Sequence, residues 1–217
     1  MPMTMQRPVT AGVPATARLS EHRAKTIHPV WVRVTHWVNA IAMLVMIGSG
    51  WEIYNASPLF GFVFPRSITL GGWLAGALQW HFAAMWVLAI NGLVYLTLGI
   101  ATGRFRRKLF PIRPSEFVSD TLAALRGKLS HDDLSVYNAV QKTLYLGVIL
   151  AAIAVVLSGL SIWKPVQFQE LTAVFGGYDT ARFVHFFAMS AIVTFLVIHI
   201  LVALLVPKSI RAMIAGR

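Results

Sequence analysis

The stretch FVHFFAMSAIVTFLVIHILVALLV, residues 183–206, runs for 24 residues without Asp, Glu, Lys or Arg. About 20 apolar residues in a helix cross the hydrocarbon core of a bilayer, which is about 30 Å thick. The stretch is therefore long enough to span a membrane, and it predicts a transmembrane helix over 182–206. It also contains His185 and His199, and an ionisable side chain at membrane depth indicates function.

Three further runs without charged residues lie upstream, at 34–51, 67–103 and 144–163. The second run is too long for one span, so part of it must be loop. Together the runs predict helices over 31–54, 74–101 and 136–162. Because a helix satisfies its own backbone hydrogen bonds in lipid, we expect an all-α bundle of four transmembrane helices. No segment alternates with a period of two, so a membrane β-barrel is not expected.

The composition agrees with this fold class. Hydrophobic residues make up 57% of the 217 residues and charged residues only 12%, whereas a soluble domain typically carries about 25% charged residues. An ordinary soluble enzyme and a disordered chain are therefore excluded, and the lipid bilayer is the first partner implied. The absence of cysteine excludes disulfides, thiolate metal sites and iron–sulfur clusters.

The basic residues indicate how the bundle is oriented. Sixteen of the 19 fall in the N-terminal stretch, in the segment between the second and third predicted helices, or at the C-terminal end. The opposite side holds Arg66, Lys164 and Arg182. By the positive-inside rule, both termini are expected on the cytoplasmic side of a bacterial cytoplasmic membrane. The net charge of +11 then needs no nucleic acid to explain it.

The domain organisation follows from the spans. We expect one transmembrane domain over 28–207, between a flexible cytoplasmic tail at 1–27 and a short basic tail at 208–217. The N-terminal stretch lacks the apolar core of a signal peptide. An amphipathic cytoplasmic helix is predicted between the second and third spans.

Local signals place the ends of that connecting segment. Ser115 is the expected N-cap of the amphipathic helix, which is predicted to end at Gly127. Ser130 followed by Asp133 predicts a capping box and an early start for the third span.

Four histidines fall inside the predicted spans, and they form two levels. His185 and His199 are 14 residues apart on one helix, so they share a face and lie about 21 Å apart along its axis. Because successive helices run in opposite directions, His81 and His185 lie near the outer ends of their helices. His36 and His199 lie near the inner ends. Each level therefore has two histidines from different helices.

Two histidines without further ligands suit a haem better than a bare metal ion. A zinc site needs three or four protein ligands, and no acidic residue is expected inside a span. A haem supplies four nitrogens and needs only two axial ligands, for which histidine is usual. We therefore predict two b-type haems, one on His36 and His199 at the inner level and one on His81 and His185 at the outer level. Covalent attachment is excluded because no C-x-x-C-H motif is present.

Other readings of the histidines remain open. They could line a path for protons or metal ions, as in a transporter, although such a path usually includes carboxylates. Alternatively, the chain could be a membrane anchor without redox function. A single histidine in a span could also simply bond a neighbouring helix. The remaining three histidines, His22, His28 and His131, are expected to face water.

Four further residues are candidates for cofactor binding. Gly50 and Gly92 lie where a flat macrocycle would pass their helices, with ordinary small-residue packing as the alternative. Arg33 and Arg182 each precede a histidine by three positions and could reach a haem propionate. Their alternative role is to extend to the interface at a helix end.

A quinone is predicted beside the inner haem. The residues expected to contact it are Asn39, Tyr137, Asn138, Gln141 and Lys142. Anchoring and capping of the third span is the competing interpretation of these side chains. No residue has the pattern of a catalytic group.

The segment HPVWVRVTHWVN, residues 28–39, resembles the first-helix motif Arg-x-x-His-Trp of bacterial di-haem cytochrome b proteins. These are the membrane subunits of nickel–iron hydrogenases and formate dehydrogenases and the related cytochrome b-561 proteins. The segment YNAVQK, residues 137–142, and the spacing of His185 and His199 are similar to the same family. The resemblance covers about 28–206.

The resemblance carries further expectations. In that family the first-helix histidine pairs with the second histidine of helix 4, which gives His36 with His199 and His81 with His185. Its members pass electrons between a periplasmic redox subunit and the quinone pool. A molybdopterin oxidoreductase is the expected type of partner here, and a homodimer is left open. Family members often have more than four helices, but no fifth span is predicted.

Overall fold

The computed structural model describes residues 28–109, 114–125 and 139–216. Four long helices dominate it: α2 Val30–Ala56, α3 Leu74–Ala101, α6 Ala139–Trp163 and α8 Tyr178–Leu205. Each is long and apolar enough to cross a membrane. All regular elements in these described ranges are helices, so the predicted all-α fold with four spans is confirmed.

The helix ends depart from the prediction where the chain leaves the charge-free runs. The helix α3 matches the predicted 74–101, whereas α2 continues to Ala56 and α8 begins at Tyr178. A charge-free run marks the part of a helix inside hydrocarbon, but the helix itself continues into the head-group layer. Asp179 in the first turn of α8 suits the positive end of the helix dipole. The predicted start of α6 before residue 139 lies outside the described residues.

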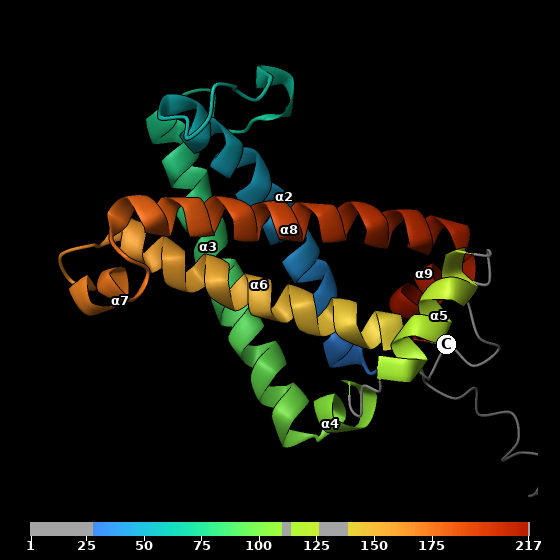
Figure 1. Ribbon diagram of the computed structural model, residues 1–217. Coiled ribbons are helices and arrows are strands. Elements are labelled where there is room, and N and C mark those ends of the chain that lie inside the picture. Colours follow the sequence, from blue (N-terminus) through green and yellow to red (C-terminus); the bar gives the residue numbers. More distant parts are fainter. Residues whose placement is uncertain (1–27, 110–113, 126–138, 217) are drawn as a thin grey trace, which may run out of the picture.

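The four helices form two antiparallel pairs. The helix α2 packs along α3, and α6 packs along α8. Figure 1 shows the second pair lying across the first. Close backbone approach within the described residues is largely confined to each pair. The pairs meet instead through long side chains, such as the rings of Tyr54 and Phe186, 5.3 Å apart, and of Phe82 and Trp163, 5.0 Å apart.

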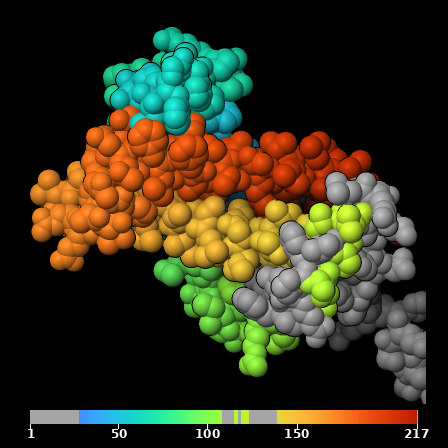
Figure 2. Space-filling view, in the orientation of Figure 1, coloured from blue at the N-terminus to red at the C-terminus, as the bar shows by residue number. Residues whose placement is uncertain are grey.

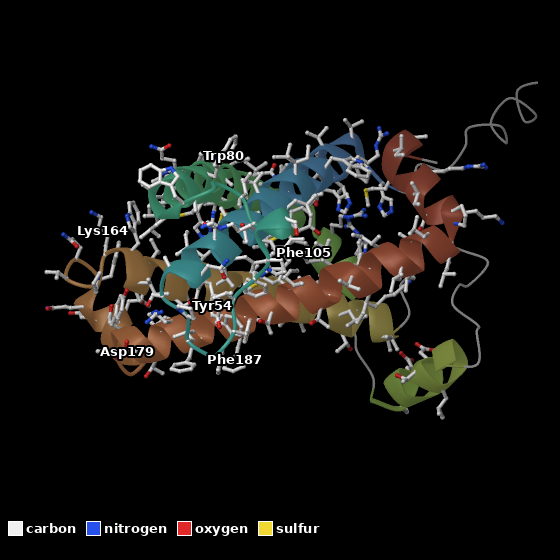
Figure 3. The ribbon with its side chains drawn as sticks, turned by 90° about the horizontal axis from the view of Figure 1, so that it is seen from above. Tyr54, Trp80, Phe105, Lys164, Asp179 and Phe187 are labelled. Carbon is white, nitrogen blue, oxygen red and sulfur yellow. The ribbon has the colours of Figure 1, made fainter. Side chains whose placement is uncertain are left out.

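We call the end of the bundle that carries the segments 57–73 and 164–177 the loop end. The labelled side chains of Trp80, Lys164 and Asp179, which come from both helix pairs, lie together at this end in Figure 3. The opposite end, where α2 begins and α8 finishes, is the tail end. By the sequence-based orientation, the loop end corresponds to the outer level and the tail end to the inner level.

The connection between α2 and α3 folds back along α2. The Leu70 amide donates a hydrogen bond to the Gly48 carbonyl at 2.9 Å. Asn55 exchanges two hydrogen bonds with the backbone of Phe64, at 2.9 and 2.8 Å. The Phe64 ring stacks on Trp51 at 4.8 Å. These contacts fix segment 57–73 as a cap over the loop end of the α2–α3 pair. In Figure 2 this capped end projects beyond α6 and α8.

This cap explains one error in the sequence prediction. Glu52 lies inside α2 and is only 7% exposed, so the expectation that no acidic residue lies inside a span is wrong. The charge-free run stops at Trp51, whereas the predicted helix 31–54 already includes Glu52. The expectation considered only the charge-free run, and the folded-back loop forms part of the surroundings of Glu52.

Short helices complete the structure. The predicted amphipathic helix is α5, Pro114–Leu125, whose first residue is Pro114 rather than a position after Ser115; proline is favoured at the first helical position. Its predicted end at Gly127 lies outside the described residues. Asp120 accepts a hydrogen bond from the Ala139 amide at 2.8 Å and so holds α5 against the start of α6.

Four more short elements were not predicted: the 3-10 helix η1 Arg66–Ile68 and the α-helices α4 Arg104–Leu109, α7 Gln169–Val174 and α9 Pro207–Ala215. The helix α9 occupies the stretch expected to be a basic tail. It starts with Pro207 and stops at Gly216, whose φ of 83° is the left-handed conformation that glycine adopts readily at a helix C-terminus.

Asn91 links α3 to α2 within the first pair. Its Nδ2 donates to the Thr35 carbonyl and to Asn39 Oδ1, both at 2.7 Å. We expect Asn91→Ala to destabilise the protein by about 1–2 kcal/mol, because two part-buried acceptors each lose this donor. Thermal unfolding in detergent would measure the loss. The matched control is Leu93→Ala on the same helix, where the side chain is 67% exposed; equal midpoints for the two variants would contradict the prediction.

Candidate functional site

At the loop end, α2 holds His81 of α3 in one orientation. The Ser49 hydroxyl donates to the Val45 carbonyl at 2.6 Å, so its oxygen is free to accept from His81 Nδ1 at 3.0 Å. A serine hydroxyl has only one hydrogen. Nδ1 therefore carries the imidazole proton, and Nε2 is left with the lone pair that a metal requires.

The second pair repeats this arrangement on His185 of α8. Ser158 of α6 donates to the Ala154 carbonyl at 2.6 Å and accepts from His185 Nδ1 at 3.1 Å. The Val155 carbonyl lies 3.0 Å from the same nitrogen. Because a carbonyl can only accept, His185 also carries its proton on Nδ1 and keeps Nε2 available.

A glycine follows each of these serines and leaves room for the imidazole. A Cβ atom at Gly50 would lie 3.5 Å from His81 Cε1, and one at Gly159 would lie 3.1 Å from His185 Cε1. The second distance is closer than ordinary van der Waals contact. The two helix pairs thus support their histidines with the same device, a Ser-Gly dipeptide on the neighbouring helix. His185 is also near enough to His81 to interact with it electrostatically.

At the tail end, His36 of α2 faces His199 of α8. Their ring centres are 6.0 Å apart, with an interplanar angle of 63°. An imidazole nitrogen binds a metal at about 2 Å, so two imidazoles on opposite sides of one ion have ring centres about 6 Å apart. Phe195 stacks on His199 at 5.5 Å, and Trp37 packs edge-on against His36 at 5.3 Å. The spacing suits one metal between the rings.

The two arginines predicted to reach propionates have different surroundings. Arg33 Nη1 donates to the Ile214 carbonyl at 2.6 Å, while its Nε is buried without a partner in the described part of the chain. That nitrogen lies one turn from His36 and suits an anionic group at the tail end. Arg182 Nη2 donates to the carbonyl and the hydroxyl of Ser57, at 2.6 and 3.1 Å. It therefore ties α8 to the end of α2.

The remaining predicted residues are those expected to contact a quinone at the tail end. Asn39 Oδ1 accepts from Asn91, as described above. Gln141 and Lys142 lie at the start of α6, and each interacts with other residues. Tyr137 and Asn138 lie outside the described residues, so the quinone contact at the tail end stays a prediction.

Two other positions complete the comparison with the sequence prediction. A Cβ atom at Gly92 would meet no described atom within 4 Å, so this glycine borders open space. His28, which was expected to face water, accepts a hydrogen bond from Arg104 Nη2 at 3.1 Å.

The donor set favours a cofactor that brings its own ligands. Across residues 28–109, 114–125 and 139–216, no three His, Cys, Asp or Glu residues come together as a metal site. Paired imidazoles, with Nε2 available on His81 and His185, glycines beside these two rings and an unpartnered arginine nitrogen fit haem. The supporting residues Ser49, Ser158 and Gly159 were missed. The available signal was the Ser-Gly dipeptide, which occurs in both the first and the third span.

The comparisons with known proteins bear on this arrangement. The model of a family described as prokaryotic cytochrome b561 matches residues 27–216. A protein of Azospira oryzae, named a putative protein-methionine-sulfoxide reductase subunit YedZ1, is 55% identical over 190 residues. The match covers 88% of this chain and 96% of that protein. A match of this extent implies haem b, and the chain belongs to the prokaryotic cytochrome b561 family.

Proposed function

We propose that this chain carries electrons across the cytoplasmic membrane between the quinone pool and a partner redox subunit, on two haem b groups. One group is held by His36 and His199, the other by His81 and His185. The observation that carries the proposal is the hydrogen bonding of Nδ1 in the two loop-end imidazoles. Each has its Nδ1 hydrogen committed to a neighbouring helix, so each offers Nε2 as a ligand.

Haem b, when bound, supplies one-electron chemistry. The protein supplies orientation and a dry site. Ser49 and Ser158 fix the tautomer of the two loop-end imidazoles, and such outer-shell bonds also raise the basicity of a ligating histidine. Gly50 and Gly159 let the rings approach the neighbouring helices. Arg33 is the residue proposed to bind a propionate at the tail end.

The orientation is part of the proposal. The 16 basic residues on one side of the spans support cytoplasmic termini. The loop end then faces the periplasm, and the tail end faces the cytoplasm. A quinol gives its electrons at the tail end, where Gln141 and Lys142 begin α6, and the partner receives them at the loop end.

The Azospira relative supports one class of partner. Its printed name makes it a subunit of a protein-methionine-sulfoxide reductase. We therefore propose that this chain serves a catalytic subunit that reduces methionine sulfoxide in proteins. Each sulfoxide takes two electrons and two protons and yields methionine and water.

Anaerobic addition of quinol to the purified protein tests the proposal. We expect quinol to reduce both b-type components in reduced-minus-oxidised spectra. In a His199→Leu variant, dithionite should still reduce the loop-end component, but quinol should reduce it at least tenfold more slowly, because the tail-end entry is missing. The matched variant is His81→Leu, whose tail-end component should respond to quinol as in the parent.

Three results would overturn the proposal. The first is a purified chain without a b-type spectrum, which would favour a membrane anchor. The second is a failure of quinol to reduce either component. The third is unchanged quinol reduction of the loop-end component in His199→Leu, which would place the entry of electrons at the loop end.

A further inference from the structure

A buried carboxylate at the loop end has no role in the electron path. Glu52 is 7% exposed, and its Oε2 is buried without a hydrogen-bond partner among the described residues. It lies one turn beyond Ser49 on α2. A buried acceptor without a donor is costly, and for a carboxylate the cost is several-fold larger than for a neutral group. Such a group indicates that something with N–H or O–H donors binds there.

Glu52 lines a cavity of about 350 Å³. Asn55, Phe64, Arg66 and Leu74 contribute to its wall. The wall is well fixed, because the Asn55 amide exchanges two hydrogen bonds with the Phe64 backbone and Phe64 stacks on Trp51. Its volume is at the lower end of the range for small-molecule sites. The cavity can therefore hold one compact polar group without rearrangement.

The cavity is lined by one helix pair and its connecting segment. All of its lining residues belong to α2, to the segment 57–73 or to the first residue of α3, and none comes from α6 or α8. It therefore belongs to the α2–α3 pair and its connecting segment and does not lie between the two helix pairs. This part of the molecule projects beyond α6 and α8 in Figure 2. A part of the chain that projects in this way is accessible to lipid, which can supply an occupant.

The charges of the wall identify the chemistry of the occupant. Glu52 offers a carboxylate at the bottom of the cavity, and the guanidinium of Arg66 stands at its exposed side. Arg66 does not donate to Glu52 Oε2, which has no hydrogen-bond partner among the described residues. A zwitterion with an ammonium at one end and a phosphate at the other would satisfy both. Leu74 and Val63, which are 45% and 62% exposed, provide an apolar exit for acyl chains.

The depth of the cavity agrees with a lipid head group. The 27 residues of α2 extend about 40 Å, which exceeds the hydrocarbon core of about 30 Å by roughly one turn of helix at each end. Glu52 lies four residues before the end of α2, at the boundary between hydrocarbon and head groups.

We propose that this cavity binds the head group of an aminophospholipid, with the ammonium on Glu52 and the phosphate on Arg66. The ammonium must carry hydrogens, because the buried Oε2 needs an N–H donor and a trimethylated nitrogen has none. The site therefore selects ethanolamine over choline lipids. The bound lipid holds the segment 57–73 against α2.

Native mass spectrometry of the full haem-loaded protein in lipid nanodiscs tests the proposal. Phosphatidylethanolamine and phosphatidylcholine differ only in three N-methyl groups, so their comparison isolates the N–H donor. We expect at least tenfold preference for phosphatidylethanolamine in the parent. Glu52→Gln and Arg66→Gln should each reduce the preference to below twofold. Arg66→Gln changes an exposed loop side chain and therefore remains informative if Glu52→Gln folds poorly.

The matched controls are Glu170→Gln and Lys164→Gln, which remove an exposed acid and an exposed base at the same end of the bundle. Both should keep the full preference. No preference in the parent, or an unchanged preference in both cavity variants, overturns the proposal. So does a preference for phosphatidylglycerol, which lacks the amine.

Two further arms separate the lipid from other occupants. Soluble glycerophosphoethanolamine should not displace the lipid, and displacement at equal concentration would show that the acyl chains are irrelevant and overturn the lipid assignment. A short-tail benzoquinol that displaces phosphatidylethanolamine would assign the cavity to quinol instead.

Discussion

Replacing His199 by leucine is expected to leave the protein with half of its haem b. The iron proposed between His36 and His199 loses one of its two axial ligands, while the loop-end pair keeps both. His36→Leu should lose the same spectral component, because both residues serve one iron. His81→Leu and His185→Leu should lose the other. Haem content per chain, together with reduced-minus-oxidised spectra of the four variants, measures the expected division into two classes.

The matched control is His131→Leu, which removes a histidine of the loop between the second and third predicted spans. It should keep the full haem content. Loss of both components from any single variant whose helical content is intact would contradict two independent pairs. Variants of His36 and His199 that lose different components would show that these residues do not share one iron.

Replacing Gly159 by leucine should remove most of the loop-end haem and leave the tail-end haem in place. The first added carbon would already lie 3.1 Å from His185 Cε1, and leucine adds three more. The imidazole must leave the Val155 carbonyl and the Ser158 hydroxyl, which together hold its Nδ1. Overpacking of this kind costs about 1–3 kcal/mol in stability, and here the strain acts on a proposed ligand.

Gly147→Leu is the matched control, because it lies on the same helix and a Cβ there would meet no described atom within 4 Å. Both substitutions raise the helix propensity of α6 equally. A difference in haem content between the two therefore reports contact with His185. Equal haem content in both variants would show that the imidazole can move aside without losing its metal.

The long helices were predictable because the hydrocarbon of the bilayer disfavours charged side chains along the whole of a span. A run without charged residues therefore indicates where a span lies, and the observed bounds of α3 match the predicted ones at both ends. The cap over 57–73 and the helix α9 were not predictable in the same way. They depend on particular long-range bonds, such as Leu70 to Gly48 and Arg33 to Ile214. The burial of Glu52 was not predicted for the same reason, because it depends on the segment 57–73 and not on α2 alone.

The histidines could be placed by depth, because the rise of 1.5 Å per residue converts sequence position into position along the axis. The residues that support them could not be placed so directly. Whether a serine reaches an imidazole depends on how far each helix is rotated about its own axis. The rotation that brings Ser158 to His185 is set by packing between α6 and α8 and leaves no periodic signal in a helix that is apolar on all sides.

The division of the bundle into two closely packed helix pairs has a consequence for biogenesis. Ser49 and His81 both belong to residues 30–101, and Ser158 and His185 both belong to residues 139–205. Each hairpin therefore contains a finished half of the loop-end site before it meets the other. The first hairpin can leave the insertion machinery with its imidazole already oriented, while the second is still being synthesised. A haem held by His81 and His185, as proposed, would join the two hairpins, because each hairpin contributes one of the two ligands.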